Sequence, residues 1–117
     1  MTTDLHLKLT NVDNYPLTDS TYLTRIVEHL AVFLGTKPTP TDLLGTTPYI
    51  ITYPTPNGTL GHTVFLPIEE SFIAIETWPE DKRATLVIVS CKEFDETTAC
   101  ELIRSYFFEP SMEGVIP

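Results

Sequence analysis

A short stretch in the middle of the chain holds most of the side chains that could do chemistry. Ser71 follows two glutamates and precedes an apolar run that ends in Thr-Trp-Pro-Glu. A serine hydroxyl is a weak nucleophile at neutral pH, so it needs a nearby acid–base group to react. Cys91 closes the next apolar run, where a thiol can act as a general acid or pack as a small hydrophobic residue. The residue types alone favour Ser71 as an ordinary strand-entry residue.

Other kinds of site find little support in the sequence. His6, His29 and His62 fall in separate predicted elements and lack the spacing of metal ligands. Cys91 and Cys100 are nine positions apart, which fits neither a zinc site nor a redox pair. There is no glycine-rich phosphate loop. The sequence therefore predicts no metal site, and each histidine is interpreted as a surface or partly buried side chain.

The spacing around Ser71 resembles the processing region of prokaryotic S-adenosylmethionine decarboxylases. In that family a Glu-Ser bond stands directly before a strand that ends in Thr-Trp-Pro-Glu, and a cysteine closes the following strand. Glu70-Ser71, Thr77-Trp78-Pro79-Glu80 and Cys91 match these features without a gap. The match is good from Gly61 to the last predicted helix and weaker upstream.

The resemblance implies a self-processing proenzyme of polyamine synthesis. The hydroxyl of Ser71 would attack the carbonyl carbon of Glu70, and the chain would separate into residues 1–70 and 71–117. Position 71 would become a pyruvoyl group. This cofactor withdraws electrons from the substrate, S-adenosylmethionine or a related amine, as carbon dioxide leaves.

The same resemblance implies roles for further residues. Cys91 matches the cysteine that returns a proton to the substrate carbon as a general acid. Glu80 matches the glutamate that binds the ribose hydroxyls. Thr63 stands where the family has a serine that assists processing, and it keeps the hydroxyl. Tyr53 or Phe65 would be the aromatic side chain that stacks on adenine.

Two positions depart from the family pattern. The histidine that supplies a proton during self-cleavage is Glu76 here. A carboxylate takes such a role only where burial or a like charge raises its pKa, and Glu69, Glu70 and Glu80 are near enough in sequence to act in this way. Phe72 stands where the prokaryotic enzymes often have histidine.

Hydrophobic spacing predicts the elements that must position these residues. Alternation at Leu5, Leu7 and Leu9 predicts a strand, and apolar residues recurring every three or four positions predict a helix from about Asp19 to Gly35. Further strands are predicted at 49–53, 62–68, 72–78 and 84–91, a last helix at 95–106, and turns or loops at 11–16 and 36–48.

This order of elements predicts an α+β, two-layer fold: a mostly antiparallel sheet with helices on one face, forming one domain over residues 1–117. The other face of the sheet then needs cover, so we expect a homodimer formed through that face or through an edge. The nearly continuous apolar run Ala84–Cys91 is typical of a central strand with cover on both faces. The tail after Phe108 shows no period and leaves little sequence for a further strand.

Bulk properties exclude several classes of partner. The formal net charge of −9 repels phosphate backbones, which argues against nucleic acid. No apolar stretch approaches the roughly 20 residues of a spanning helix, so no membrane association is expected. The N-terminus lacks the features of a signal peptide. We therefore expect a cytoplasmic protein in which Cys91 and Cys100 are reduced.

Three functions remain open at this point. The first is the self-processing S-adenosylmethionine decarboxylase. The second is a related decarboxylase of a basic amino acid, ornithine or arginine, which the negative charge of Glu76 favours. The third is a non-processing family member that binds a ligand or partner without catalysis, which the loss of the histidine and the short tail favour.

Overall fold

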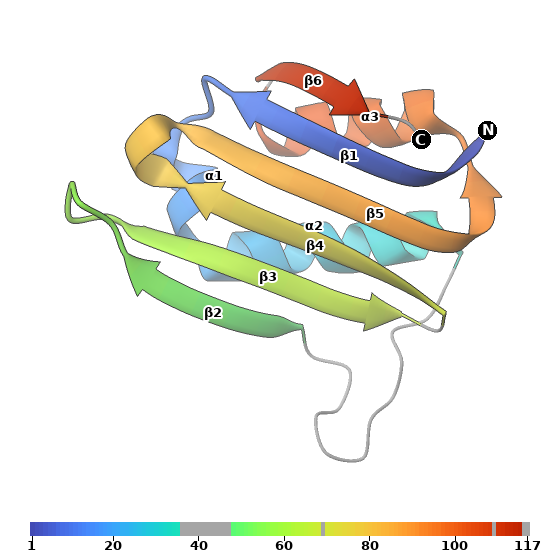
Figure 1. Ribbon diagram of the computed structural model, residues 1–117, viewed down its shortest axis with the longest axis horizontal. Helices are drawn as coiled ribbons and strands as arrows, with labels where there is room; N and C mark the ends of the chain where they lie inside the picture. Colours follow the sequence, from blue (N-terminus) through green and yellow to red (C-terminus); the bar gives the residue numbers. More distant parts are fainter. Residues whose placement is uncertain (36–47, 69, 109, 116–117) are drawn as a thin grey trace.

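One hydrophobic core lies between a sheet and the helices that cover one of its faces (Figure 1). The computed structural model describes residues 1–35, 48–68, 70–108 and 110–115. In chain order the described elements are β1 (Thr2–Thr10), α1 (Asn14–Thr18), α2 (Ser20–Phe33), β2 (Tyr49–Pro54), β3 (Leu60–Ile68), β4 (Ser71–Trp78), η1 (Pro79–Asp81), β5 (Arg83–Phe94), α3 (Glu96–Tyr106) and β6 (Ser111–Val115). The loop predicted at 36–48 lies outside the described residues, apart from Pro48.

The described strands form one sheet in the order β2-β3-β4-β5-β1-β6, and each neighbouring pair is antiparallel. Figure 1 shows the helices on one side of this sheet, and no described helix or strand lies on the other side. The predicted α+β two-layer arrangement is therefore confirmed. The strands that carry Ser71 and Cys91, β4 and β5, are neighbours near the middle of the sheet, so the fold can bring these two residues together.

The core is built from the spacing seen in the sequence. Along β1 the leucines are buried, whereas His6 and Lys8 between them are exposed. In α2 the buried side chains form the predicted stripe of Leu23, Ile26, Val27, Leu30 and Ala31. Asp19 caps this helix by accepting a hydrogen bond from the Tyr22 N–H at 3.1 Å. Each large apolar side chain removed from water stabilises the fold by about 1.5–3 kcal/mol, so this stripe fixes α2 on the sheet.

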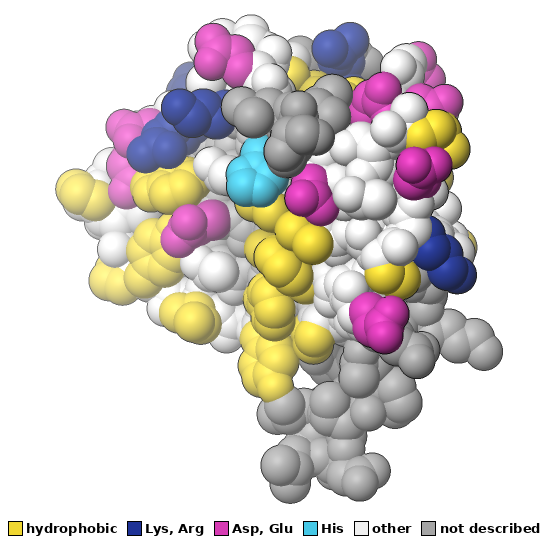
Figure 2. All heavy atoms as spheres, turned by 45° about the vertical axis from the view of Figure 1, so that its right-hand side comes forward, with side chains coloured by type: hydrophobic (Ala, Val, Ile, Leu, Met, Phe, Trp, Pro, Cys, Tyr) yellow, Lys and Arg dark blue, Asp and Glu magenta, His cyan; other side chains and the backbone are white. Residues whose placement is uncertain are grey.

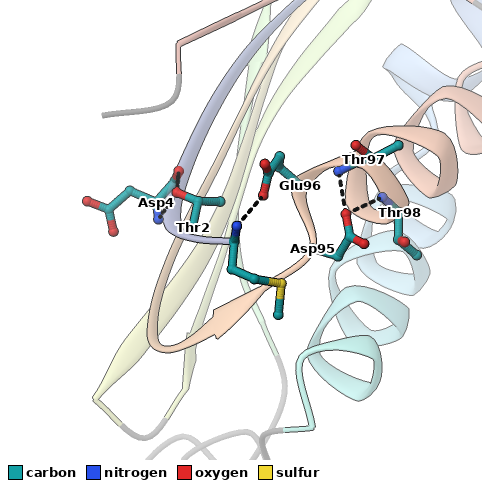
Figure 3. A network of polar contacts seen from close by, with 7 residues as sticks. Thr2, Asp4, Asp95, Glu96, Thr97 and Thr98 are labelled. Carbon is teal, nitrogen blue, oxygen red and sulfur yellow. Dashed lines mark hydrogen bonds and ion pairs between the residues drawn. The ribbon is translucent and has the colours of Figure 1, made fainter.

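The start of α3 lies beside the start of β1 (Figure 3). The Asp95 carboxylate accepts hydrogen bonds from the backbone N–H groups of Thr97 at 2.9 Å and Thr98 at 3.3 Å. These bonds satisfy two of the donors that every helix start leaves unpaired. The amino group of Met1 lies 3.6 Å from the Glu96 carboxylate. The predicted helix start at Asp95 is confirmed.

Two elements differ from the sequence expectations. The tail forms β6, in which Met112 pairs with Leu9 of β1. The expectation that the tail is too short for a strand was wrong because the edge of β1 supplies the hydrogen-bonding partners. A short helix, α1, occupies part of the segment predicted as a turn, and its Pro16 is tolerated because it stands in the first helical turn.

Candidate active site

The turn between β3 and β4 holds Glu70 in an uncommon backbone conformation. Its φ angle is 57°, in the left-handed region that few residues other than glycine adopt. Ser71 follows as the first residue of β4, and its side chain is half-buried. Glu69 lies outside the described residues. The bond predicted to be cut therefore joins a left-handed residue to the start of an interior strand of the sheet.

The hydroxyl of Ser71 contacts the backbone of β5. The Cys91 N–H donates a hydrogen bond to Ser71 Oγ, with 2.8 Å between nitrogen and oxygen. Such a donor stabilises negative charge that develops on the oxygen as the hydroxyl loses its proton. The Cys91 residue is exposed, so the interpretation of its side chain as a packed small hydrophobic group is wrong. The fold thus brings together the two residues that the sequence singled out first.

A second group of candidate residues lies farther along the sheet, on the face away from the helices. Thr63 of β3 and Glu76 of β4 are register partners, and Thr63 Oγ1 donates to Glu76 Oε1 at 3.3 Å. From β2, the Tyr53 hydroxyl donates to the backbone carbonyl of Thr77. Three adjacent strands therefore contribute polar groups to one patch of the sheet.

The surroundings of Tyr53 keep its hydroxyl protonated. Partial burial raises the pKa of this phenol, and the negative charges of Glu76 and Glu80 raise it further, while Arg83 lowers it. The ring lies across Gly61, its register partner on β3: a Cβ at position 61 would stand only 2.5 Å from Tyr53 Cε2. Tyr53 is therefore a hydrogen-bond donor that a glycine allows to reach β4.

Glu80 lies in the short turn that joins β4 to β5. Its Oε1 atom is buried and has no hydrogen-bond partner among the described residues. Beside it, the Arg83 guanidinium lies 4.0 Å from the centroid of the Trp78 ring, and Arg83 Nε lies 3.5 Å from the Asp81 carboxylate. A buried carboxylate oxygen without a partner costs free energy that a donor from a ligand or from water would recover. Glu80 thus has an unused acceptor.

Hydrophobic side chains cross the uncovered face of the sheet. The register aligns Tyr49, Phe65, Ala74 and Val87 across β2, β3, β4 and β5. The Phe65 residue is 36% exposed, and its ring centroid lies 6.3 Å from that of Tyr49 and 5.5 Å from that of Phe72. Figure 2 shows hydrophobic side chains gathered in a column on this side of the molecule. This face is therefore suited to a planar ligand or a second protein surface.

The candidate residues form two clusters rather than one. Ser71 and Cys91 lie where β4 begins, whereas Glu76 and its neighbours lie toward the end of β4 (Figure 1). Five positions of extended strand separate Ser71 from Glu76, which is roughly 16 Å at about 3.3 Å per residue. The expectation that Glu70 lies beside Glu76 was wrong for the same reason. Within one copy of the chain, the Glu76 carboxylate does not reach Ser71.

Two adjoining cavities open beside β1 and β6, away from Ser71 and Cys91. Their volumes are about 280 and 460 Å³, and both are lined by Lys8, Thr85 and Glu113. In the part of the chain that the structure describes, no group of three or more His, Cys, Asp or Glu side chains could hold a metal ion. No helix among the same residues is long and apolar enough to cross a membrane.

Three residues of the second cluster were not predicted: Gly61, Thr77 and Arg83. The Asn57-Gly58 pair did not supply the register, because a two-residue turn at these positions would place Tyr53 opposite His62. In the structure the loop is one residue longer and is closed by the Thr55 N–H, which donates to the Thr59 carbonyl at 2.9 Å, so Tyr53 pairs with Gly61. Thr77 entered the sequence argument only as part of a motif. The position of Arg83 over the Trp78 ring depends on the turn geometry of η1, for which the sequence carries no local signal.

Comparisons with known proteins found one family and a similar solved structure. The sequence model of a family described as S-adenosylmethionine decarboxylase matches residues 3–114. Among solved structures, the chain is similar to the adenosylmethionine decarboxylase from Aquifex aeolicus, with a TM-score of 0.71 and 18% sequence identity over 99% of this chain and 89% of that chain. No curated protein matches the chain. The structural likeness shows a shared fold, and the family match spans nearly the whole sequence.

Proposed function

Because the chain belongs to the S-adenosylmethionine decarboxylase family, we propose that it is a proenzyme that cleaves itself between Glu70 and Ser71 and then decarboxylates S-adenosylmethionine in polyamine synthesis. The observation that carries this proposal is the 2.8 Å hydrogen bond from the Cys91 N–H to Ser71 Oγ. This bond joins the proposed nucleophile, Ser71, to the residue proposed as proton donor, Cys91. Ser71 directly follows Glu70, which has a left-handed backbone conformation.

Self-cleavage would begin with attack of Ser71 Oγ on the carbonyl carbon of Glu70. The C–N bond breaks, and an ester of the Glu70 acyl group with the Ser71 oxygen replaces the amide. Loss of the α-proton of residue 71 then breaks the Cβ–O bond, which frees residues 1–70 with a terminal carboxylate and leaves dehydroalanine. Water then replaces the nitrogen of the dehydroalanine, which departs as ammonia, and residue 71 becomes a pyruvoyl group. The conformation of Glu70 costs on the order of 1–3 kcal/mol, which cleavage relieves.

The residues around position 71 fit a pyruvoyl group. The group would stay covalently attached at the first residue of β4, where the Cys91 N–H is a donor suited to a carbonyl oxygen as well as to a hydroxyl. When present, it supplies an electron-withdrawing carbonyl for the amine of the substrate. We assign Cys91, which is exposed on the adjacent strand, the return of a proton to the substrate carbon.

The second cluster is proposed to bind the nucleoside part of the substrate. The unpartnered Oε1 of Glu80 is an acceptor for ribose hydroxyls. Phe65, which is partly exposed, and Tyr53, whose ring lies against Gly61, are the proposed contacts of the adenine ring. Thr63 and Glu76, hydrogen-bonded to each other, are proposed to assist the proton transfers of self-cleavage.

A homodimer would unite the two clusters. Glu76 lies roughly 16 Å along β4 from the Ser71 of its own chain, at about 3.3 Å per strand residue. Among the described residues, no helix or strand of the same copy covers the hydrophobic face that carries Phe65. A second copy packed on this face would bury it and bring its own Thr63 and Glu76 to the Ser71 of the first copy. Each site would then contain residues from both chains.

Release of carbon dioxide from labelled substrates tests the proposed reaction. The purified chain is given S-adenosylmethionine, ornithine and arginine in separate reactions. We expect turnover of S-adenosylmethionine, because the acceptor at Glu80 and the ring of Phe65 suit a nucleoside. Turnover of ornithine or arginine alone would favour a basic amino acid decarboxylase, an alternative supported by the negative charges of Glu76 and Glu80 near Tyr53. A chain that stays whole and releases no carbon dioxide would favour the non-processing alternative.

Replacing Cys91 by alanine should separate cleavage from decarboxylation. The hydrogen bond to Ser71 comes from the backbone of residue 91, so Cys91→Ala retains it and should still cleave itself. Loss of the proton donor should lower kcat for decarboxylation by about 10²-fold or more. The matched control is Cys100→Ala. Cys100 lies in α3, and burial raises the pKa of its thiol, so the kcat of this variant should stay near that of the wild type. An unchanged kcat in Cys91→Ala would remove Cys91 from the mechanism.

A further inference from the structure

Thr77 is a buried polar residue in the midst of the second cluster. Its side chain is fully buried, and in β4 it follows Glu76 and precedes Trp78. Thr77 Oγ1 donates a hydrogen bond to the backbone carbonyl of Leu17 at 2.9 Å and accepts one from the backbone N–H of His62 at 2.9 Å. One hydroxyl group therefore joins β4 to β3 and to α1 on the helical side of the sheet.

The backbone carbonyl of Thr77 is bonded from β2, across β3. It accepts the hydrogen bond of the Tyr53 hydroxyl, which reaches it across Gly61. Because a Cβ at position 61 would overlap the Tyr53 ring, the glycine is needed for this contact. Thr77 is thus bonded through its side chain to β3 and α1, and through its main chain to β2.

His62 extends the same network. Its Nε2 lies 2.8 Å from the backbone carbonyl of Thr18, so this nitrogen carries the hydrogen and donates. Its Nδ1 is hydrogen-bonded to Thr52 Oγ1 at 2.8 Å. The imidazole is buried, so the interpretation of His62 as a surface or partly buried side chain was wrong, and both ring nitrogens have partners. The network therefore connects β2, β3 and β4 with the junction of α1 and α2.

Such a network fixes geometry more strictly than apolar packing does. Buried polar groups are costly without partners, so the arrangement is stable only in the one register that satisfies all of them. The register that pairs Thr63 with Glu76 is the same one that brings the His62 N–H to the Thr77 hydroxyl.

We infer that Thr77 is a positioning residue of the active site, which holds Glu76 and the Trp78–Glu80 segment where self-cleavage and substrate binding require them. This inference rests on the proposed function. Thr77 is buried, so it touches no substrate and acts through its neighbours in the chain. Misplacing a reacting group by about 1 Å can cost 10²-fold in rate, so a small shift of β4 would be visible in cleavage.

The test compares Thr77→Val, which keeps the shape but loses the hydroxyl, with Thr77→Ser, which keeps the hydroxyl. The control is a substitution of Ile103, which is buried in α3. Of Ile103→Val and Ile103→Ala, the variant is used whose thermal unfolding midpoint is closer to that of Thr77→Val. The rate of self-cleavage is followed by intact mass at a temperature where every variant is folded. Acrylamide quenching of tryptophan fluorescence is measured in parallel, because Trp78 is the only tryptophan of the chain and directly follows Thr77.

We expect Thr77→Val to cleave at least about tenfold more slowly and to expose Trp78 to quencher, and Thr77→Ser to restore both values. The Ile103 control should change neither. Wild-type cleavage and quenching in Thr77→Val would overturn the inference, as would an equal slowing in the Ile103 control. If the wild-type chain itself does not cleave, the proposed function fails, and the positioning role is then judged from the quenching of Trp78 fluorescence. Quenching that is raised in Thr77→Val and restored to the wild-type value in Thr77→Ser supports the role. Unchanged quenching in Thr77→Val overturns it.

Discussion

A chain in which alanine replaces Ser71 is expected to remain whole. Alanine has no hydroxyl to attack the Glu70 carbonyl, so neither the ester nor the elimination can follow, and no pyruvoyl group is made. Intact-mass spectrometry should give one species of 117 residues for Ser71→Ala and two fragments, residues 1–70 and 71–117, for the wild type. The two wild-type masses should add up to the uncut chain plus one water minus one ammonia, which distinguishes this chemistry from ordinary proteolysis.

Ser105→Ala is the matched control for Ser71→Ala. Ser105 is exposed in α3, and its hydroxyl donates to the Leu102 carbonyl in the same helix, at 2.7 Å. Its loss should leave cleavage and the fragment masses unchanged. Decarboxylation by Ser71→Ala should fall to the background rate, while circular dichroism shows the wild-type fold. Fragments ending at residue 70 in Ser71→Ala, or an uncut wild-type chain, would contradict the proposed cleavage.

The fold was largely predictable because its core follows simple periods. Leu5, Leu7 and Leu9 alternate in one strand, and the stripe of α2 repeats every three or four residues, so burial could be assigned from spacing alone. The strand β6 has no such period. Its place is set by pairing with the edge of β1, as in the pair of Leu9 with Met112. These are tertiary contacts, and the sequence of a short tail carries no local signal for them.

The contact between Ser71 and Cys91 could be expected from the sequence because their strands follow one another along the chain. The antiparallel order of β4 and β5 sufficed to bring Ser71 to Cys91. The surroundings of Glu76 were not predictable in the same way, because nearness in sequence was taken for nearness in space. Glu70 is six positions away, but an extended strand places it at the other end of β4. Glu76 accepts a hydrogen bond from Thr63, and its charge acts on Tyr53, both from other strands.

Replacing Glu76 by glutamine is expected to slow self-cleavage by about 10²-fold or more, because the amide cannot exchange a proton at neutral pH. Glutamine keeps the size of the side chain and an oxygen for the Thr63 hydroxyl, which now donates at 3.3 Å, so the fold should be unchanged. Glu76→His introduces the histidine that the sequence resemblance implies at this position, and it should cleave at least as fast as the wild type. The rates are followed by intact mass from freshly made protein. Equal rates in the wild type and Glu76→Gln would exclude a proton-transfer role for this carboxylate.

Combining a chain that cannot be cut with a chain that is cut slowly should restore cleavage if Glu76 acts on the partner copy. A Ser71→Ala chain supplies Glu76 but cannot be cut, and a Glu76→Gln chain supplies Ser71 but lacks the carboxylate. When both are expressed together, we expect the Glu76→Gln chain to be cut in mixed dimers, since roughly 16 Å of strand separates the two residues within one copy. A partner that carries both substitutions is the control and should give no rescue. If Glu76 served its own chain, the mixture would cleave no faster than Glu76→Gln alone, and the shared site across the hydrophobic face would have to be abandoned.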